Sequence, residues 1–110
     1  MVPYRNSSRC FHRALQSLSR QAFRDFEVVT VDNRSTDGSS LIAESFAASD
    51  PRFRSASCEG SLVDALNLGL YLSTGRWIAR FDSDDICHRD RLGMQFSLAE
   101  RLGERTVVSC

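Results

Sequence analysis

The sequence predicts an α/β fold in which a mostly parallel β-sheet is flanked by helices. Short apolar runs, suited to buried strands, alternate along the chain with stretches whose apolar residues recur at helical spacing. Two of these runs end directly in clusters of polar side chains, as strands do at the ligand-binding edge of a parallel sheet. Strands that alternate with helices form βαβ units with right-handed crossovers, and such units build parallel sheets.

The length and the charge of the chain narrow the class of protein. Its 110 residues suffice for one domain at most, with a core of modest size. All 14 cationic side chains are arginine and they balance 14 acidic ones, so the zero net charge argues against a strongly basic nucleic-acid-binding protein. No apolar run approaches the roughly 20 residues of a membrane span. We therefore expect no nucleic-acid partner and no membrane segment in this chain.

The cysteines and the N-terminal residues indicate the cellular compartment in which the protein is located. Cys10, Cys58, Cys87 and Cys110 show none of the close spacings typical of zinc ligands. The N-terminal residues run into polar side chains rather than into the apolar stretch of a secretory signal. These features predict reduced thiols and a cytoplasmic protein.

The first half of the chain contains the clearest elements. The spacing of apolar residues predicts a helix over Arg9–Gln21. The β-branched run Phe26–Val31 predicts a strand that is buried on both faces. A polar turn over residues 32–40 leads to a second helix, which the Asp50-Pro51 pair ends because proline disfavours helical backbone in the residue before it.

The second half predicts a weak strand, a helix, a strand, a helix and a last strand that has only begun. Their bounds are Phe53–Cys58, Leu62–Leu72, Trp77–Phe81, His88–Leu102 and Thr106–Ser109. Gly75 stands where a helix C-terminal glycine belongs, and we expect Trp77 to pack in the core.

Both ends of the chain look incomplete for a domain of this class. Met1-Val2-Pro3 is too short to be the first strand that the following helix needs, and the last strand breaks off at Cys110. We therefore expect residues 1–110 to form a single, truncated domain. Such a part exposes an unpaired sheet edge and apolar faces, so self-association is a further expectation.

Polar clusters follow two of the predicted strands, where parallel sheets bind ligands. One is Asp32-Asn33, and the other is Asp82-Ser83-Asp84-Asp85. Three carboxylates within four residues repel one another unless a cation or hydrogen-bond donors offset their charge. Mg²⁺ and Mn²⁺ prefer oxygen ligands, often one or two carboxylates together with substrate phosphates. The second cluster therefore predicts a metal-bridged diphosphate; the alternative is a solvated acidic turn that caps the next helix.

Four pieces of the sequence, in order and spacing, resemble family 2 glycosyltransferases. They are Pro3-Tyr4-Arg5-Asn6 with the helix after it, the run from Asp25 to Ser39, the segment Asp50–Arg54, and the stretch from Ala65 through Asp82-Ser83-Asp84-Asp85 to Leu92. The resemblance covers nearly the whole chain. It implies a GT-A fold, which is a nucleotide-binding α/β sandwich. It also implies transfer of a sugar from a nucleotide-diphosphate donor to a hydroxyl group, usually with inversion at the anomeric carbon.

The resemblance implies positions for the donor nucleotide. Pro3 would lie in the loop that lines the nucleotide, Asp32 and Asn33 beside its base and ribose, and residues 61–64, with Asp64 among them, near the donor. The implied partners are a nucleotide-diphosphate sugar, with a UDP-sugar as the first choice, and a glycan or lipid-linked acceptor.

The resemblance also implies a divalent cation, Mn²⁺ or Mg²⁺. Asp82 and Asp84 correspond to the metal-binding Asp-x-Asp motif, with Asp84 as the direct ligand and Asp82 nearer the ribose. Asp85 could share either role. The cation would neutralise the charge that develops on the departing diphosphate.

Two departures from the family pattern matter. Asn33 stands where the family usually has aspartate, and an amide has no charge and a different set of donors and acceptors, which leaves the base preference open. The family places its catalytic base and acceptor-binding segment well downstream of the Asp-x-Asp motif, so we expect the base beyond Cys110. No residue of this chain is assigned as the base.

Two other functions compete with this interpretation. One is a non-catalytic nucleotide-binding or interaction module left from a truncated glycosyltransferase. The other is a different α/β nucleotide enzyme, such as a nucleotidyltransferase. The latter predicts a glycine-rich phosphate loop after the first strand, and the sequence has none there.

Overall fold

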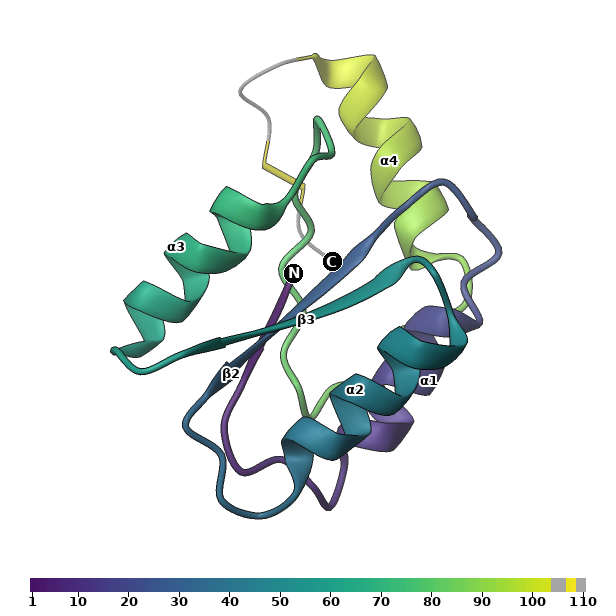
Figure 1. Cartoon of the computed structure of the whole chain (residues 1–110). Helices are drawn as coiled ribbons and strands as arrows, with labels where there is room; N and C mark the ends of the chain where they lie inside the picture. The colour runs from purple at the N-terminus through teal and green to yellow at the C-terminus, as the bar shows by residue number, and fades with distance from the viewer. Residues whose placement is uncertain (104–106, 109–110) are drawn as a thin grey trace.

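Three parallel strands form the sheet of the computed structural model, which describes residues 1–103 and 107–108 (Figure 1). Across the sheet they are β1 (Val2–Tyr4), β2 (Val28–Asn33) and β3 (Phe53–Cys58). The expected mostly parallel sheet with flanking helices is thus confirmed. The N-terminal run, which we judged too short for a strand, does form one. Three residues suffice because β1 pairs with just Thr30–Asp32 of β2.

The central strand β2 is buried on both faces, as its sequence predicts. Val28 belongs to the larger core cluster, whereas Val29 and Val31 pack with Ala65 on the other face. Successive side chains of a strand point to opposite faces, so a strand covered on both sides needs an unbroken apolar run. Thr30 fits into this run because its hydroxyl donates to the Arg54 carbonyl oxygen at 3.2 Å.

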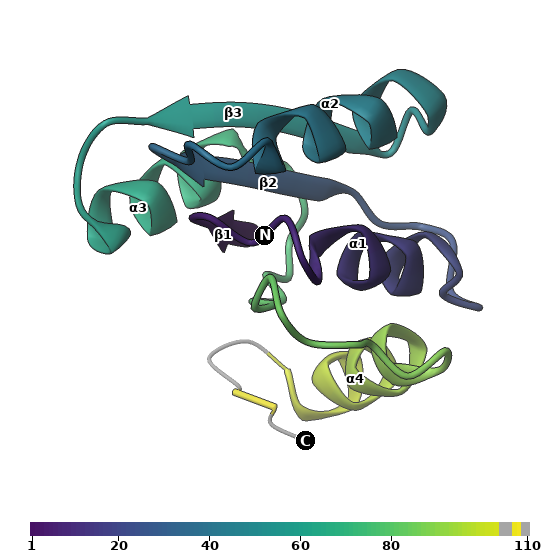
Figure 2. The same cartoon turned by 90° about the horizontal axis from the view of Figure 1, so that it is seen from below.

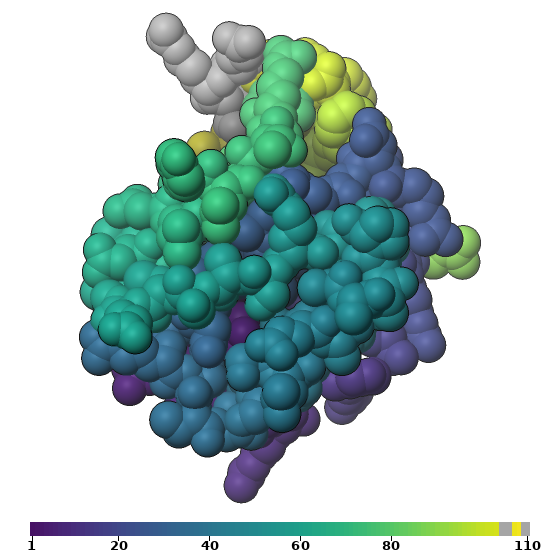
Figure 3. Space-filling view, in the orientation of Figure 1, coloured from purple at the N-terminus to yellow at the C-terminus, as the bar shows by residue number. Residues whose placement is uncertain are grey.

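Helices cover both faces of the sheet. α1 (Phe11–Ser19) and α2 (Ser39–Ser49) lie on one face, and α3 (Leu62–Leu72) lies on the other (Figure 2). The space-filling view shows the teal and green atoms of the β3 and α3 region spread over much of one side (Figure 3). α4 (Arg91–Leu102) lies beyond α1, away from the sheet (Figure 2).

The position of α3 follows from the handedness of parallel crossovers. β1, β2 and β3 follow one another across the sheet, so their two right-handed crossovers place α1 and α2 on the same face. After β3 the chain returns across the sheet to the side of β1 that faces away from β2. Because it now crosses the sheet in the reverse direction, a right-handed crossover places α3 on the face opposite α1 and α2. Beside β1, the N-terminal amine of Met1 donates to the Ala79 carbonyl oxygen at 2.7 Å, and the Phe81 N–H donates to the Met1 carbonyl oxygen at 3.1 Å.

The strand predicted over Trp77–Phe81 is wrong, although the segment lies beside β1 as a strand would. Among the described residues, two hydrogen bonds to Met1 form on this edge before the chain turns away at Asp82. Trp77 is also not in the core. It lies half-buried at the surface, and its indole N–H donates to Glu100 of α4 at 2.5 Å. An amphipathic indole can pack one side and still keep such a polar partner.

Two expected helix ends are corrected as well. α4 begins at Arg91 rather than at His88, because the carbonyl of His88 closes a turn by accepting the Arg91 N–H at 3.0 Å. Gly75 does not end α3, which stops at Leu72. The N–H and the hydroxyl of Ser73 both donate to the Gly69 carbonyl oxygen and so satisfy the end of the helix. The strand predicted over Thr106–Ser109 falls largely outside the described residues.

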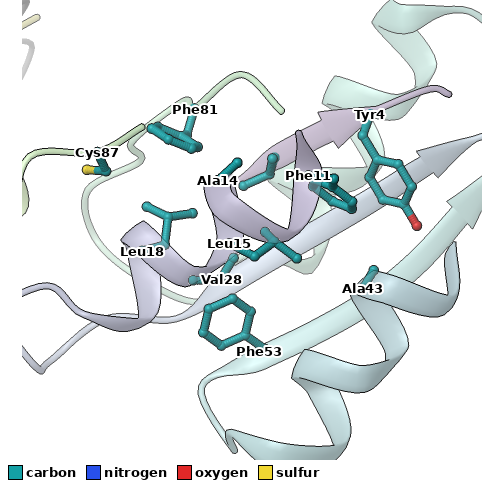
Figure 4. Packing of buried hydrophobic residues seen from close by; sticks show 11 residues of the cluster. Tyr4, Phe11, Ala14, Leu15, Leu18, Val28, Ala43, Phe53, Phe81 and Cys87 are labelled. Atoms are coloured by element: carbon teal, nitrogen blue, oxygen red, sulfur yellow. The ribbon is translucent and has the colours of Figure 1, made fainter. Parts of the chain in front are cut away.

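The main core lies between the sheet, α1 and the segment that follows α3 (Figure 4). The buried side chains of α1 keep the predicted helical spacing; they are Phe11, Ala14, Leu15 and Leu18. Phe81 and Cys87 enter the same cluster from either side of the acidic turn. Among the described cysteines, Cys10 and Cys58 are free thiols and Cys87 is buried, whereas Cys110 lies outside the described residues.

A pair of leucines tests this packing. Leu15 is completely buried in the main cluster, whereas Leu41 on α2 is 68% exposed. We expect Leu15→Ala to lower the free energy of unfolding by about 3 kcal/mol, because it removes buried methyl groups and leaves a cavity. Leu41→Ala should change it by about 0.5 kcal/mol or less. Urea unfolding followed by circular dichroism measures both, and equal losses would contradict the assignment of the core.

Candidate donor-binding site

A cleft of about 490 Å³ opens at the carboxyl ends of β1 and β2. Its walls come from the end of β1, the last residue of β2, the start of α3 and the acidic turn. The lining residues are Pro3, Tyr4, Arg5, Asn33, Gly60, Ser61, Leu62, Arg80, Asp82, Ser83 and Asp84. The cleft lies where the order of the chain reverses, between β1 and residues 79–81. Parallel α/β sheets bind ligands at such a position, because the neighbouring loops leave in opposite directions and open a crevice.

Two of the three carboxylates of the acidic turn line the cleft. They are Asp82 and Asp84; all three are exposed, but Asp85 lies outside the lining. The Asp85 N–H donates to the Asp82 carbonyl oxygen at 3.2 Å and closes the turn. Arg80 pairs with Asp82 at 3.2 Å, but both side chains are about half exposed, so this pair contributes at most about 1 kcal/mol.

The turn fits a divalent cation that is held jointly with a substrate. Among the described residues, no three acidic, histidine or cysteine side chains converge on one point. Two carboxylates are nonetheless a sufficient protein contribution for Mg²⁺ when phosphate oxygens and water complete its shell. Arg5 and Arg80 also line the cleft, so its four charged side chains sum to zero. A diphosphate there would meet two carboxylates unless a cation neutralised them.

Asn33 places a buried polar group in the cleft. It is 8% exposed, and its Oδ1 has no hydrogen-bond partner among the described residues. A buried acceptor without a partner lowers stability, so a ligand that donates to it would relieve this cost. Pro3, buried in β1, lies in the same lining.

Asp32 lies close to the cleft but outside its lining. Its Oδ1 accepts the Ser35 N–H at 3.0 Å, which ends β2 in a turn. Burial, reinforced by the charge of Asp32, raises the pKa of the Tyr4 phenol well above its usual range. Tyr4 therefore stays neutral in the wall of the cleft.

The structure does not bring Asp64 into the cleft. Asp64 forms a capping box at the start of α3, where its Oδ2 accepts the Ser61 N–H at 2.6 Å and its own N–H donates to Ser61 Oγ at 3.3 Å. The Ser61 N–H is the main reason that the pKa of Asp64 lies below its usual range. A Cβ on Gly60 would lie 2.2 Å from the Asp64 carboxylate, so this tight start of α3 requires glycine. A contact between Asp64 and the donor stays a prediction.

Hydrogen bonds join the loop after β1 to the loop after β2. The Asn6 N–H donates to Ser35 Oγ at 3.0 Å, and Asn6 Oδ1 accepts the Thr36 N–H at 2.8 Å. The Ser8 N–H donates to Asp37 Oδ2 at 2.9 Å. Bonds from Ser39 and from this N–H hold the pKa of Asp37 well below its usual range, so Asp37 is a carboxylate throughout the neutral range. The two loops at the cleft therefore form one polar unit.

The sequence interpretation missed several residues of the cleft. Tyr4 belongs to it as the last residue of β1 and Arg5 as the residue after it, and Ser83 belongs to it because it lies between Asp82 and Asp84. The rule that ligands bind beyond strand ends would have indicated Tyr4 and Arg5 if the N-terminal run had been taken as a strand.

Comparison with known proteins assigns the family. The family model described as glycosyl transferase family 2 matches residues 1–110. The chain belongs to glycosyl transferase family 2. Among curated relatives, the amylovoran biosynthesis glycosyltransferase AmsB of Erwinia amylovora is 32% identical over 115 residues, which cover 98% of this chain.

Solved structures confirm the GT-A fold. Crystalline TarS 1–349 of S. aureus matches 91% of this chain at 28% identity with a TM-score of 0.82. The mannosyltransferase PcManGT of Pyrobaculum calidifontis, solved with GDP-Man and Mn²⁺, matches 83% at 28% identity with a TM-score of 0.71. This family 2 chain spans 38% of AmsB, 31% of the TarS chain and 28% of the PcManGT chain.

The hydrogen bonds of Asp37 in this polar unit predict that the stability of the fold depends on pH. A carboxyl whose pKa is lower in the folded chain stabilises the fold above its unfolded pKa of about 3.9 and loses this contribution as the pH falls through the folded pKa. We expect Asp37→Asn to lower the urea midpoint at pH 7 and to flatten its decline between pH 7 and pH 3. Asp25, which is exposed and makes no hydrogen bond in the described part of the chain, supplies the control Asp25→Asn. An unchanged pH profile in Asp37→Asn would contradict the prediction.

Proposed function

We propose that the protein is a glycosyltransferase that transfers a sugar from a nucleotide-diphosphate sugar to a hydroxyl group, and that this chain supplies the part that binds donor and metal. The cleft at the reversal beside β1 carries the proposal, since it combines two carboxylates, two arginines and a buried amide. Family membership supports the reaction class.

Mn²⁺ or Mg²⁺ is the proposed cofactor. Asp84 would be its direct ligand, with Asp82 and then Asp85 as further candidates. Bound there with the donor, the cation would act as a Lewis acid toward the leaving diphosphate. Arg5 and Arg80 add positive charge to the lining of the cleft, where it would stabilise charge on the phosphates. PcManGT, with its GDP-Man and Mn²⁺, supports this assignment.

The nucleotide is proposed to lie along the ends of β1 and β2. Asn33 Oδ1 would accept a hydrogen bond from an N–H of the base or a hydroxyl of the ribose, and Pro3 would pack beneath it. Asp32 and Asp64 remain proposed contacts of the nucleotide and the donor. A UDP-sugar is the first choice of donor, supported by the TarS structure in complex with UDP, which matches this chain with a TM-score of 0.80.

The acceptor and the stereochemistry are also proposals. We expect inversion at the anomeric carbon, a glycan or lipid-linked acceptor, and a catalytic base that this chain does not contain. The name of AmsB, an amylovoran biosynthesis protein, supports an acceptor in polysaccharide synthesis. None of the helices in the described residues is long and apolar enough to cross a bilayer. The cytoplasmic location expected from the sequence stays a prediction.

Titration with UDP tests the proposed site. We expect Mn²⁺ to raise the affinity for UDP at least tenfold, because it removes the repulsion between the diphosphate and the two carboxylates. Asp84→Asn should abolish most of this gain, whereas Asp25→Asn should retain it. Isothermal titration calorimetry with Mn²⁺ and with EDTA measures both. Equal UDP affinities in the two solutions for the wild type would overturn the metal-assisted function.

Self-association through α3 is a further proposal. The helix exposes Leu62, Val63, Leu70 and Tyr71, and the last is 84% exposed. Burying such side chains against a second copy would remove apolar surface from water. We expect sedimentation equilibrium to show a dimer whose dissociation constant rises at least tenfold in Leu70→Ser/Tyr71→Ser. Leu41→Ser, on α2, is the matched control. A monomer at all concentrations would contradict the proposal.

A further inference from the structure

A chain of hydrogen bonds connects the start of α2 to the Asp-x-Asp motif. Asp37 Oδ1 accepts the hydroxyl of Ser39, and Ser39 Oγ accepts the Ser7 N–H at 2.8 Å. Ser7 Oγ in turn lies 2.7 Å from the Oγ of Ser83, the middle residue of the motif. One aspartate at the start of α2 is therefore linked through three serines to the turn that carries the metal-binding carboxylates.

The donors and acceptors of this chain are fixed by its first member. A carboxylate can only accept, so the hydroxyl of Ser39 must donate to Asp37. That leaves a lone pair of Ser39 Oγ for the Ser7 N–H, which can only donate. Ser7 Oγ also lies within 3.3 Å of the Arg5 carbonyl oxygen, to which it donates. The hydroxyl proton of Ser83 is therefore the one that bridges Ser83 and Ser7.

The first links of the chain are held rigidly. Ser39 is completely buried, and its N–H donates to Asp37 Oδ1 at 3.0 Å in addition to its hydroxyl. The Ser8 N–H occupies the other carboxylate oxygen of Asp37. Asp37 thus fixes two consecutive residues of the loop after β1, one directly and one through Ser39.

The acidic turn itself has few other restraints. Phe81 and Cys87 anchor it on either side in the core. Between them, the bonds of Asp82 to Arg80 and to the Asp85 N–H are local. Among the described residues, the bond from Ser83 to Ser7 is the one that ties residues 82–86 to a distant segment.

We propose that Ser83 is a positioning residue, and that Asp37, Ser39 and Ser7 act through it to set the Asp82 and Asp84 carboxylates against the loop that carries Arg5. The functional part of this inference rests on the proposed metal-assisted binding of a nucleotide diphosphate. Without the bond between Ser83 and Ser7, the turn can rotate about Phe81 and Cys87. The two carboxylates would then move away from the position at which they and the diphosphate can share a cation. The middle position of the motif therefore contributes to cation binding without touching the cation.

Hydrogen exchange of the free protein tests the chain of bonds itself. We expect Ser83→Ala, Ser7→Ala and the double variant to raise exchange of the Asp85 amide, which donates within the turn, by the same factor, about fivefold, which corresponds to the net contribution of one hydrogen bond. Ser83→Thr, which keeps the hydroxyl, should restore protection. Ser97→Ala on the exposed side of α4 is the matched control. Unchanged exchange in Ser7→Ala and Ser83→Ala would overturn the proposal, whatever the protein binds.

Cation binding then tests the consequence. In Ser7→Ala, which removes the bond to Ser83 from outside the lining of the cleft, we expect the gain in UDP affinity on adding Mn²⁺ to fall about fivefold, whereas UDP affinity in EDTA stays within twofold of the wild type. A merely structural serine would lower both affinities alike, and that result would overturn the positioning role. If Mn²⁺ does not change the UDP affinity of the wild type, the proposed function is wrong. The exchange experiment would still test the chain of hydrogen bonds.

Discussion

The return of the chain to the far side of β1 is the constraint on which the rest of the structure depends. Because crossovers between parallel segments are right-handed, this return carries α3 over the face of the sheet that α1 and α2 leave open. α3 then covers Val29 and Val31, so that β2 becomes a strand buried on both sides. The same reversal separates the loop after β1 from the acidic turn and leaves the cleft between them. The burial of β2 and the cleft thus both result from the return of the chain to the far side of β1.

The cleft combines a rigid floor with polar walls. The floor consists of the ends of β1 and β2, whose side chains belong to the two apolar clusters. The walls are held mainly by bonds between side chains and backbone, such as those of Asn6 and Asp37. Such bonds contribute about 1 kcal/mol each and can open locally without disturbing the core. The walls can therefore open locally while the strands that form the floor stay in place.

The sequence predicts the elements that depend on local periodicity and misses those that depend on distant partners. The apolar spacing of α1 and the β-branched run of β2 led to correct elements, since both are read from neighbouring residues. β1 was missed because its three residues become a strand only by pairing with β2. The segment after Thr74 was predicted as a strand because its composition fits one, but the ladder stops after two bonds. Gln21 shows the same limit: it is completely buried and binds the backbone of His88 and Leu92, and no local pattern indicates this.

The acidic side chains divide into two groups that the zero net charge of the chain does not distinguish. Asp37, Asp64 and Glu27 accept several hydrogen bonds each, which lower their pKa values and use up their lone pairs. Such carboxylates fix loops and helix ends but have little capacity left for a metal ion. Asp84 lines the cleft and makes no hydrogen bond in the described part of the chain, so both of its oxygens remain open. The net charge does not show which carboxylates accept hydrogen bonds and which have oxygens without a partner. The available lone pairs, rather than the number of acidic residues, distinguish the candidate metal ligand from the carboxylates that build its surroundings.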